Sequence, residues 1–368
     1  MAVISFKCPN CDGELIFDPS SQKYKCEYCA SLFLQEELDA MRPGQTKEAE
    51  TNGQEPGTAE DGPAGQTEAR DESGGAHDGE AVSYTCPSCG AQIVTDATTA
   101  AAFCYYCHNP VVLSGRLEGK YLPDKVIPFS ITREAARKGF QEYISKKKFV
   151  PKAFFNKKQI ESLTGVYFPY WHYHAVLDGK LQADARRLRV WRVGDMEYTE
   201  TKHYSVSREG QAELDNLTEN ALKKANSKLA AGVMPYEFEK MQDFKLGYLS
   251  GFLAERRDIE RQEVEGRMQG EMRSGAERLL RETITGYDSV SVRNSGFTPE
   301  KEDWSYVLFP VWTLTYKGKN GKIYYYSMNG QTGKVYGELP VDYGKAAAVS
   351  GILAVVVLIL GLIGGYFL

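Results

Sequence analysis

The 368-residue sequence has no cysteine after residue 107, and its N-terminus has no basic stretch followed by a long apolar run. A secretory signal needs both features, so we expect none here. The chain is therefore expected to stay in a reducing compartment, where cysteines bind metals more often than they form disulfides.

Positive charge is scarce where nucleic-acid binding would need it. The formal net charge is −5, and no Lys or Arg lies between Ala81 and Gly115. Near the N-terminus, Lys7, Lys23 and Lys25 are offset by nearby acidic residues. Binding to phosphates gains from counterion release and needs a net basic face. The charge pattern therefore argues against nucleic acid as a partner.

Large apolar side chains are almost missing from residues 40–81. Between Asp39 and Glu80 there are eleven acidic residues against three basic ones, a net charge of −8. Such a segment cannot bury enough surface to offset the entropy cost of ordering it. We predict an acidic disordered linker over 37–81.

What the sequence does have is two matched pairs of Cys-x-x-Cys motifs. Each unit contains one pair, then fourteen residues, then the second pair. Two thiolates on a tight turn form one edge of a tetrahedron, and a short hairpin returns a second pair to complete it. The predicted ligands are Cys8, Cys11, Cys26, Cys29, Cys86, Cys89, Cys104 and Cys107.

These units are interpreted as zinc ribbons over 1–36 and 82–116, each with one Zn ion. A ribbon of this size has almost no core, so metal binding would supply roughly 10 kcal/mol of folding free energy. Disulfides are not expected in a reducing compartment. A redox Cys-x-x-Cys motif would not require a second, matched pair. Iron–sulfur ligation is the remaining alternative.

Histidines offer a second candidate metal site. His108 follows a completed ligand set, which favours a spare surface imidazole. His172 and His174 alternate on an expected strand and share one face, and His203 could lie on a neighbouring strand. Because no carboxylate supports them nearby in the sequence, satisfied structural histidines are the preferred interpretation.

Residues 117–342 are predicted to form a β-rich α+β body with a long helix. We expect helices from Thr132 to about 148, over 218–231 and over 252–285. Strands are expected over 166–177, 180–193, 198–213, 306–316, 322–328 and 334–339, with turns at Asp178-Gly179 and Gly194-Asp195. The similar motifs Phe168-Pro-Tyr-Trp171 and Phe309-Pro-Val-Trp312 are expected to pack in the core, each Pro at a strand start or edge.

Residues 346–368 contain no charged residue. At about 1.5 Å per residue they span roughly 34 Å, enough to cross a bilayer. We predict one transmembrane helix with everything before Lys345 in the cytoplasm. Gly361 and Gly365 give it a small-residue face that suits a homodimer.

The cluster of Lys146, Lys147 and Lys148 with Lys152, Lys157 and Lys158 is either a solvated face, the preferred interpretation, or a contact with anionic lipid.

Six further motifs are spread along nearly the whole chain. They are Cys86-Pro-Ser-Cys-Gly-Ala91, Phe103-Cys-Tyr-Tyr-Cys-His-Asn109, Leu122-Pro-Asp-Lys-Val-Ile-Pro-Phe129, Gly165-Val-Tyr-Phe-Pro-Tyr-Trp171, Tyr248-Leu-Ser-Gly-Phe-Leu-Ala254 and Asn329-Gly-Gln-Thr-Gly-Lys-Val335. In these motifs the chain resembles a family of uncharacterised membrane proteins of Gram-positive bacteria that contain a transcription-factor-IIB (TFIIB)-type zinc ribbon. The resemblance implies a membrane-associated scaffold, and some relatives occur alongside membrane-stress proteins of the phage-shock and flotillin-like types.

No phosphate-binding glycine loop, zinc-protease helix or nucleophile elbow is found, so we do not expect an enzyme. The expected function is a cytosol-facing adaptor that recruits membrane-associated proteins to the bilayer. A membrane-tethered nucleic-acid-binding or transcription-related factor is the first alternative. An enzyme with a groove around Trp171, His172 and Trp312 is the second.

Overall fold

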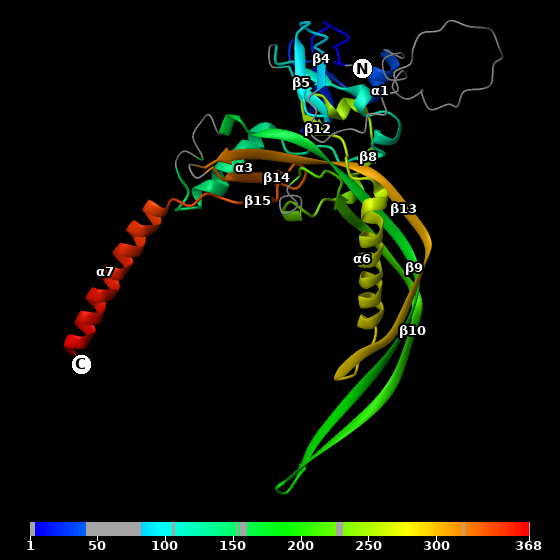
Figure 1. Cartoon of the computed structure of the whole chain (residues 1–368), viewed down its shortest axis with the longest axis vertical. Coiled ribbons are helices and arrows are strands. Elements are labelled where there is room, and N and C mark those ends of the chain that lie inside the picture. The colour runs from blue at the N-terminus through cyan, green and yellow to red at the C-terminus, as the bar shows by residue number, and fades with distance from the viewer. Residues whose placement is uncertain are drawn as a thin grey trace, which may run out of the picture.

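The structure is a computed structural model, and it describes residues 4–41, 82–104, 107–151, 154, 160–225, 231–318 and 321–367. Most of the predicted linker, 42–81, lies outside these residues. Its first residues, 37–41, belong to the short helix α1 (Gln35–Met41). The body is mixed α+β, the cysteine units lie at one end of it, and an apolar helix leaves it at the C-terminus (Figure 1).

A ten-stranded sheet forms the body, and three very long strands dominate it. They are β9 (Thr164–Val193), β10 (Met196–Asn220) and β13 (Ser289–Lys317). β9 is central and pairs antiparallel with both others along most of its length. The three strands curve together into an arch (Figure 1). Side chains alternate between faces along β9, so that Tyr173, Ala175 and Leu177 are buried while Asp178 is exposed.

Helix α6 (Arg261–Glu282) covers the concave face of this arch (Figure 1). Its buried stripe is Val264, Met268, Met272, Ala276 and Leu280, at the spacing of one helix face. The prediction of a helix over 252–285 was therefore too long, because residues 253–255 form strand β12. Three glycines inside the helix do not interrupt it.

Helix α3 (Arg133–Ser145) begins where expected. The Thr132 hydroxyl caps it by accepting a hydrogen bond from the backbone N–H of Ala135, at 3.2 Å. Its buried residues are Ala136, Phe140 and Ile144. The helix predicted over 218–231 is wrong over 218–225, because residues 218–220 continue strand β10 and turns follow, whereas residue 231 is helical.

The turn predicted at Asp178-Gly179 is also wrong, because β9 runs straight through it. Gly179 pairs with Gly210 on one side and Phe297 on the other. A Cβ at Gly179 would lie 2.6 Å from the Phe297 ring, so the glycine gives room to a packed aromatic side chain. The hairpin turn at Gly194-Asp195 is confirmed, and Gly194 has a φ of 58°.

The two Phe-Pro-x-Trp motifs lie side by side, since Phe168 of β9 pairs directly with Phe309 of β13. Trp171 and Trp312 are both buried, which confirms core packing. The prolines were expected at strand starts or edges. Instead, Pro169 lies inside β9, where its carbonyl accepts a hydrogen bond from Ala221 N–H at 3.0 Å.

The remaining strands of the sheet are short. β14 (Ile323–Asn329) and β15 (Val335–Gly337) extend it beyond β13, and β8 (Lys125–Val126) and β11 (Gln242–Asp243) lie on the β13 side as well. On the other side, β12 (Leu253–Glu255) pairs with β9 and then with β6 (Thr99–Phe103), which pairs with β7 (Pro110–Val112). Half of the second cysteine unit is thus part of the large sheet.

The rest of both cysteine units forms small sheets of its own. β1 (Leu15–Asp18), β2 (Lys23–Cys26) and β3 (Leu32–Phe33) make one sheet, and β4 (Val82–Thr85) with β5 (Gln92–Thr95) makes another. The first unit also rests on the body, because the Ser250 hydroxyl donates to the Leu15 carbonyl at 2.5 Å.

Helix α7 (Tyr343–Phe367) leaves the body after β15 and points away from the cysteine units (Figure 1). Its segment Tyr343–Gly361 is long and apolar enough to cross a membrane and has no buried residue. At its start, Asp342 N–H donates to the Phe149 carbonyl at 2.7 Å, and the Lys345 ammonium donates to the Val150 carbonyl at 2.8 Å.

Candidate metal centres

Each Cys-x-x-Cys motif folds into the same turn. The first cysteine's N–H donates to the carbonyl five residues later, and its own carbonyl accepts the N–H four residues later, in all four motifs. The residue at that fourth position has a positive φ each time: Asp12, Ala30, Gly90 and His108, between 57° and 74°. Four repeats of one strained turn indicate that the backbone is shaped to place two thiols together.

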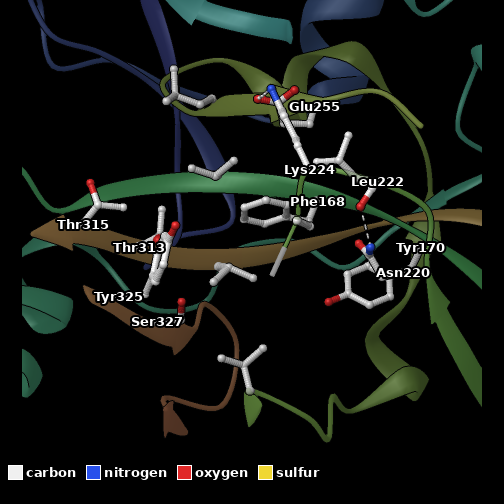
Figure 2. A pocket seen from close by; sticks show the side chains of 15 residues that line it. Phe168, Tyr170, Asn220, Leu222, Lys224, Glu255, Thr313, Thr315, Tyr325 and Ser327 are labelled. Atoms are coloured by element: carbon white, nitrogen blue, oxygen red, sulfur yellow. Dashed lines mark hydrogen bonds and ion pairs between the residues drawn. The ribbon is translucent and has the colours of Figure 1, made fainter. Parts of the chain in front are cut away.

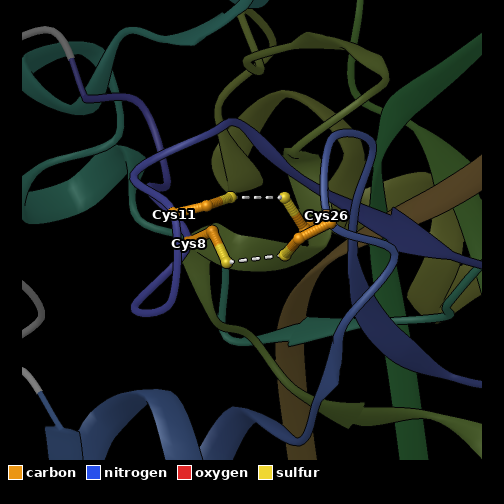
Figure 3. Close-up of side chains that lie close together, drawn as sticks. Cys8, Cys11 and Cys26 are labelled. Atoms are coloured by element: carbon orange, nitrogen blue, oxygen red, sulfur yellow. Dashed lines mark hydrogen bonds between the residues drawn. The ribbon is translucent and has the colours of Figure 1, made fainter.

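The first centre joins the turns at Cys8 and Cys26. Figure 3 shows Cys8, Cys11 and Cys26 converging from facing loops. The Sγ atoms of Cys8 and Cys29 lie 3.6 Å apart, and those of Cys11 and Cys26 lie 3.5 Å apart. Four Sγ atoms at 2.3 Å from a tetrahedral zinc ion are about 3.8 Å apart, whereas a disulfide is about 2.05 Å long. The spacing fits a metal and not a disulfide.

The second centre repeats this geometry. Cys86 and Cys107 Sγ atoms lie 3.7 Å apart, as do those of Cys89 and Cys104. Within each centre all four sulfur atoms lie within 4.8 Å of one another. The structure therefore brings all eight predicted ligands together in the two predicted sets. Both donor sets fit zinc, which prefers tetrahedral thiolates in structural sites.

Hydrogen bonds shift the pKa values of two thiols of the first centre in opposite directions. Hydrogen bonds with the side chain and backbone of Ser31 lower the pKa of Cys29 to about 6, which favours the metal-binding thiolate at that residue. Against a backbone hydrogen bond with Gly13, which lowers it, hydrogen bonds with Cys26 and Cys29 raise the pKa of Cys11 to about 12. In both centres the first cysteine of every motif is buried against the hairpin, whereas the second is more accessible.

The two centres are joined through Glu14, a buried carboxylate of the first unit. Its Oε1 accepts hydrogen bonds from Lys7 Nζ at 2.5 Å, from Ser88 Oγ at 3.0 Å and from Asn109 Nδ2 at 3.0 Å. Ser88 directly precedes Cys89, and Asn109 follows Cys107 by two residues. Ile4 also forms a β-bridge with Val112. The two ribbons thus touch directly, an arrangement that the sequence left open.

The histidines have separate roles. His108 occupies the positive-φ position of its turn, which Gly90 occupies in the other motif of the same unit. Its place in the turn is therefore a backbone role, and it is not one of the four ligands. His172 is buried beside Asn216, and burial lowers the pKa of its imidazole. His203 pairs with Arg186 toward the far end of the hairpin and does not join the others.

His174 does have carboxylate neighbours, which sequence reasoning missed. Its ring contacts Asp215, and Glu213 completes a group whose ligand atoms lie within 4.8 Å. A register shift in β10 between Leu214 and Leu217 places Asp215 against the histidine. The long hairpin could have shown this contact from sequence, because the turn at Gly194 fixes which residues of β9 and β10 meet.

A largely apolar cavity of about 280 Å³ lies against strands β9, β13 and β14. Figure 2 shows Phe168 and Tyr170 of β9, Thr313 and Thr315 of β13, and the ion pair of Lys224 with Glu255 at its rim. Trp171 and Trp312 point to the opposite face, and His172 is not among its lining residues. The groove around Trp171, His172 and Trp312, which the enzyme alternative requires, therefore does not coincide with this cavity.

Comparison with known proteins gives one informative relative. The chain is 31% identical over 346 residues to the uncharacterized protein YdjG of Bacillus subtilis (strain 168). The aligned region covers 94% of this chain and 93% of the relative. No family model matches the chain. No solved structure matches it.

Proposed function

The chain belongs to the family of this Bacillus subtilis protein, and on that premise we propose that it is a membrane-anchored adaptor whose zinc ribbons recruit other proteins to the cytoplasmic face of the membrane. In this proposal the two ribbons are of the TFIIB type, each holds one structural zinc ion, and α7 spans the bilayer once. A role in a membrane-stress response is part of the same proposal.

One observation carries the proposal: both metal centres lie together at one end of the molecule, and α7 points away from them (Figure 1). Glu14 and the Ile4–Val112 bridge hold them as one unit, and β12 connects that unit to the sheet. A rigid pair of ribbons held away from a membrane anchor is well placed to meet partners in the cytoplasm.

The surface of this unit suits a protein partner. Exposed apolar side chains gather on the first ribbon, where Tyr28 is 79% exposed and Leu32 and Leu34 are also exposed. Exposed aromatic and aliphatic side chains are typical of contact surfaces, whereas phosphate binding would need a basic one. The charge of the ribbons thus favours protein over nucleic acid.

The test is proximity labelling from the full-length chain in its native membrane. The variant Tyr28→Ser/Leu32→Ser should lose reproducible membrane-associated neighbours while its zinc content is unchanged. Leu279→Ser, at another exposed leucine, is the matched control and should keep them. Identical neighbours for both variants, or no reproducible membrane-associated protein with the unmodified chain, would refute the adaptor function.

A further inference from the structure

The far end of the β9–β10 hairpin carries apolar side chains in solvent. β13 begins opposite Arg186, so beyond that point the pairing continues only between β9 and β10. An isolated two-stranded ribbon is marginally stable in water. We define the hairpin tip as residues 188–201. Its exposed large apolar side chains are Leu188, Val190, Trp191, Val193, Met196 and Tyr198.

The apolar side chains of the hairpin tip lie next to its turn, and arginine side chains lie among and behind them. The cross-strand pairs Val193–Met196 and Trp191–Tyr198 share one face next to the turn. The rings of Trp191 and Tyr198 stack at 5.7 Å, and the Arg189 guanidinium lies 5.6 Å from the Trp191 ring. The hairpin tip itself contains Arg189 and Arg192 against Asp195, Glu197 and Glu200. Arg186, Arg187 and Lys202 lie directly behind it and bring residues 186–202 to five basic against three acidic residues.

This chemistry matches the surface of an anionic bilayer. Trp and Tyr favour the interface between headgroups and hydrocarbon, and each cation near an anionic surface gains about 1 kcal/mol. If the tip touched such a surface, the apolar side chains at the turn would lie among the acyl chains. The arginine side chains just behind them would lie among the headgroups.

The shape of the molecule allows the contact. In Figure 1, a line from the start of α7 to the hairpin tip leaves both ribbons, the sheet and α6 on one side, with α7 on the other. A flat bilayer crossed by α7 can therefore touch the hairpin tip without meeting the rest of the protein. The concave face of the arch, with α6, would then face the membrane.

The start of α7 has matching chemistry. Lys146, Lys147, Lys148, Phe149 and Val341 line one surface hollow beside it. The hydrogen bonds from residues 342 and 345 hold this basic segment at the helix start. An apolar helix preceded by cations and exposed apolar side chains is the usual arrangement at an anionic membrane surface.

We propose that the hairpin tip is a second membrane-contact site, which rests on the anionic bilayer that α7 crosses, so that the arch stands on the membrane at two points. This inference depends on the membrane anchoring in the proposed function.

The test uses the fluorescence of Trp191 in the full-length chain. The protein is reconstituted into vesicles rich in phosphatidylglycerol with brominated acyl chains, which quench nearby indoles. Of the four tryptophans, Trp171 and Trp312 are buried in the core, whereas Trp191 is 40% exposed. Quenching should fall by at least half in Trp191→Phe and should persist in the matched control Trp304→Phe.

Charge is tested separately. The variant Arg189→Gln/Arg192→Gln should lose most of the quenching, whereas Lys23→Gln/Lys25→Gln, which removes two cations from the first ribbon, should not. Equal quenching in vesicles of pure phosphatidylcholine would refute the requirement for anionic lipid.

Flotation of the vesicles separates the two hypotheses. Protein that floats with vesicles but shows no quenching assigned to Trp191 would refute the hairpin contact and leave the anchor intact. Protein that does not float at all would refute the membrane anchoring and the contact together.

Discussion

Removal of the Glu14 carboxylate should uncouple the two metal centres. Glu14 is 5% exposed, and all three of its hydrogen bonds converge on Oε1. Oε2 has no hydrogen-bond partner among the described residues. In Glu14→Ala the bridge is lost completely. In Glu14→Gln the amide oxygen can replace Oε1 and the amide nitrogen takes the place of Oε2.

The size of the effect follows from these contacts. A hydrogen bond to a charged group contributes about 1.5–3 kcal/mol, and breaking a buried ion pair costs about 3–5 kcal/mol. Because Lys7 and the partners of Glu14 are partly reached by water, we expect Glu14→Ala to cost about 3 kcal/mol. Glu14→Gln should cost about 1 kcal/mol, since only the charge is lost.

The assay is the rate of zinc release to a chromophoric chelator from the detergent-solubilised full chain. If release follows local opening, a loss of about 3 kcal/mol corresponds to release roughly 150-fold faster. Glu27→Ala, at an exposed acid of the same ribbon, is the control and should release zinc at the original rate. Equal rates for Glu14→Ala and Glu27→Ala would show that the ribbons are not coupled through this carboxylate.

The same structure supports five further predictions. Elemental analysis of purified chain should give two zinc ions, and Cys26→Ser should lower this to one. His174→Ala should leave the zinc content at two, and a drop would place a zinc ion on the sheet. Deletion of 343–367 should move the protein from the membrane fraction to the soluble fraction, as seen by fractionation and immunoblotting. Gly179→Ala should lower the free energy of unfolding by about 1–3 kcal/mol because its Cβ would press on Phe297; an unchanged denaturant midpoint would contradict this. In low salt, mobility-shift assays with DNA and RNA should detect no binding, and salt-sensitive binding would support the nucleic-acid alternative.

The metal centres could be predicted from sequence because their geometry is local. The spacing of Cys8 and Cys11 fixes one tetrahedral edge, and a short hairpin is enough to bring the second pair. α3 was predicted for the same reason, since Thr132 acts on the turn that follows it. In such cases the determining contacts lie within a few residues.

The long strands were not predictable from local signals. Asp178-Gly179 has the composition of a turn, but Phe297, more than one hundred residues later, packs over Gly179 and keeps the strand continuous. Residues 218–220 were expected in a helix, yet pairing with β9 makes them a strand. Tertiary pairing outweighed local propensity in both cases. The neighbours of His174 were missed because the expected turn at Asp178-Gly179 ended the hairpin too early, whereas the register of an unbroken hairpin brings them together.

Strand β12 has only three residues, yet it holds β6 of the second ribbon on one side and β9 on the other. Oxidation of the zinc thiolates would eject the metal and unfold the ribbon, which has little core of its own. The edge of the arch would then be left unpaired, and unpaired strand edges associate with other chains. Peroxide treatment should therefore promote association between chains, an outcome that crosslinking can detect and that a reductant given beforehand should prevent.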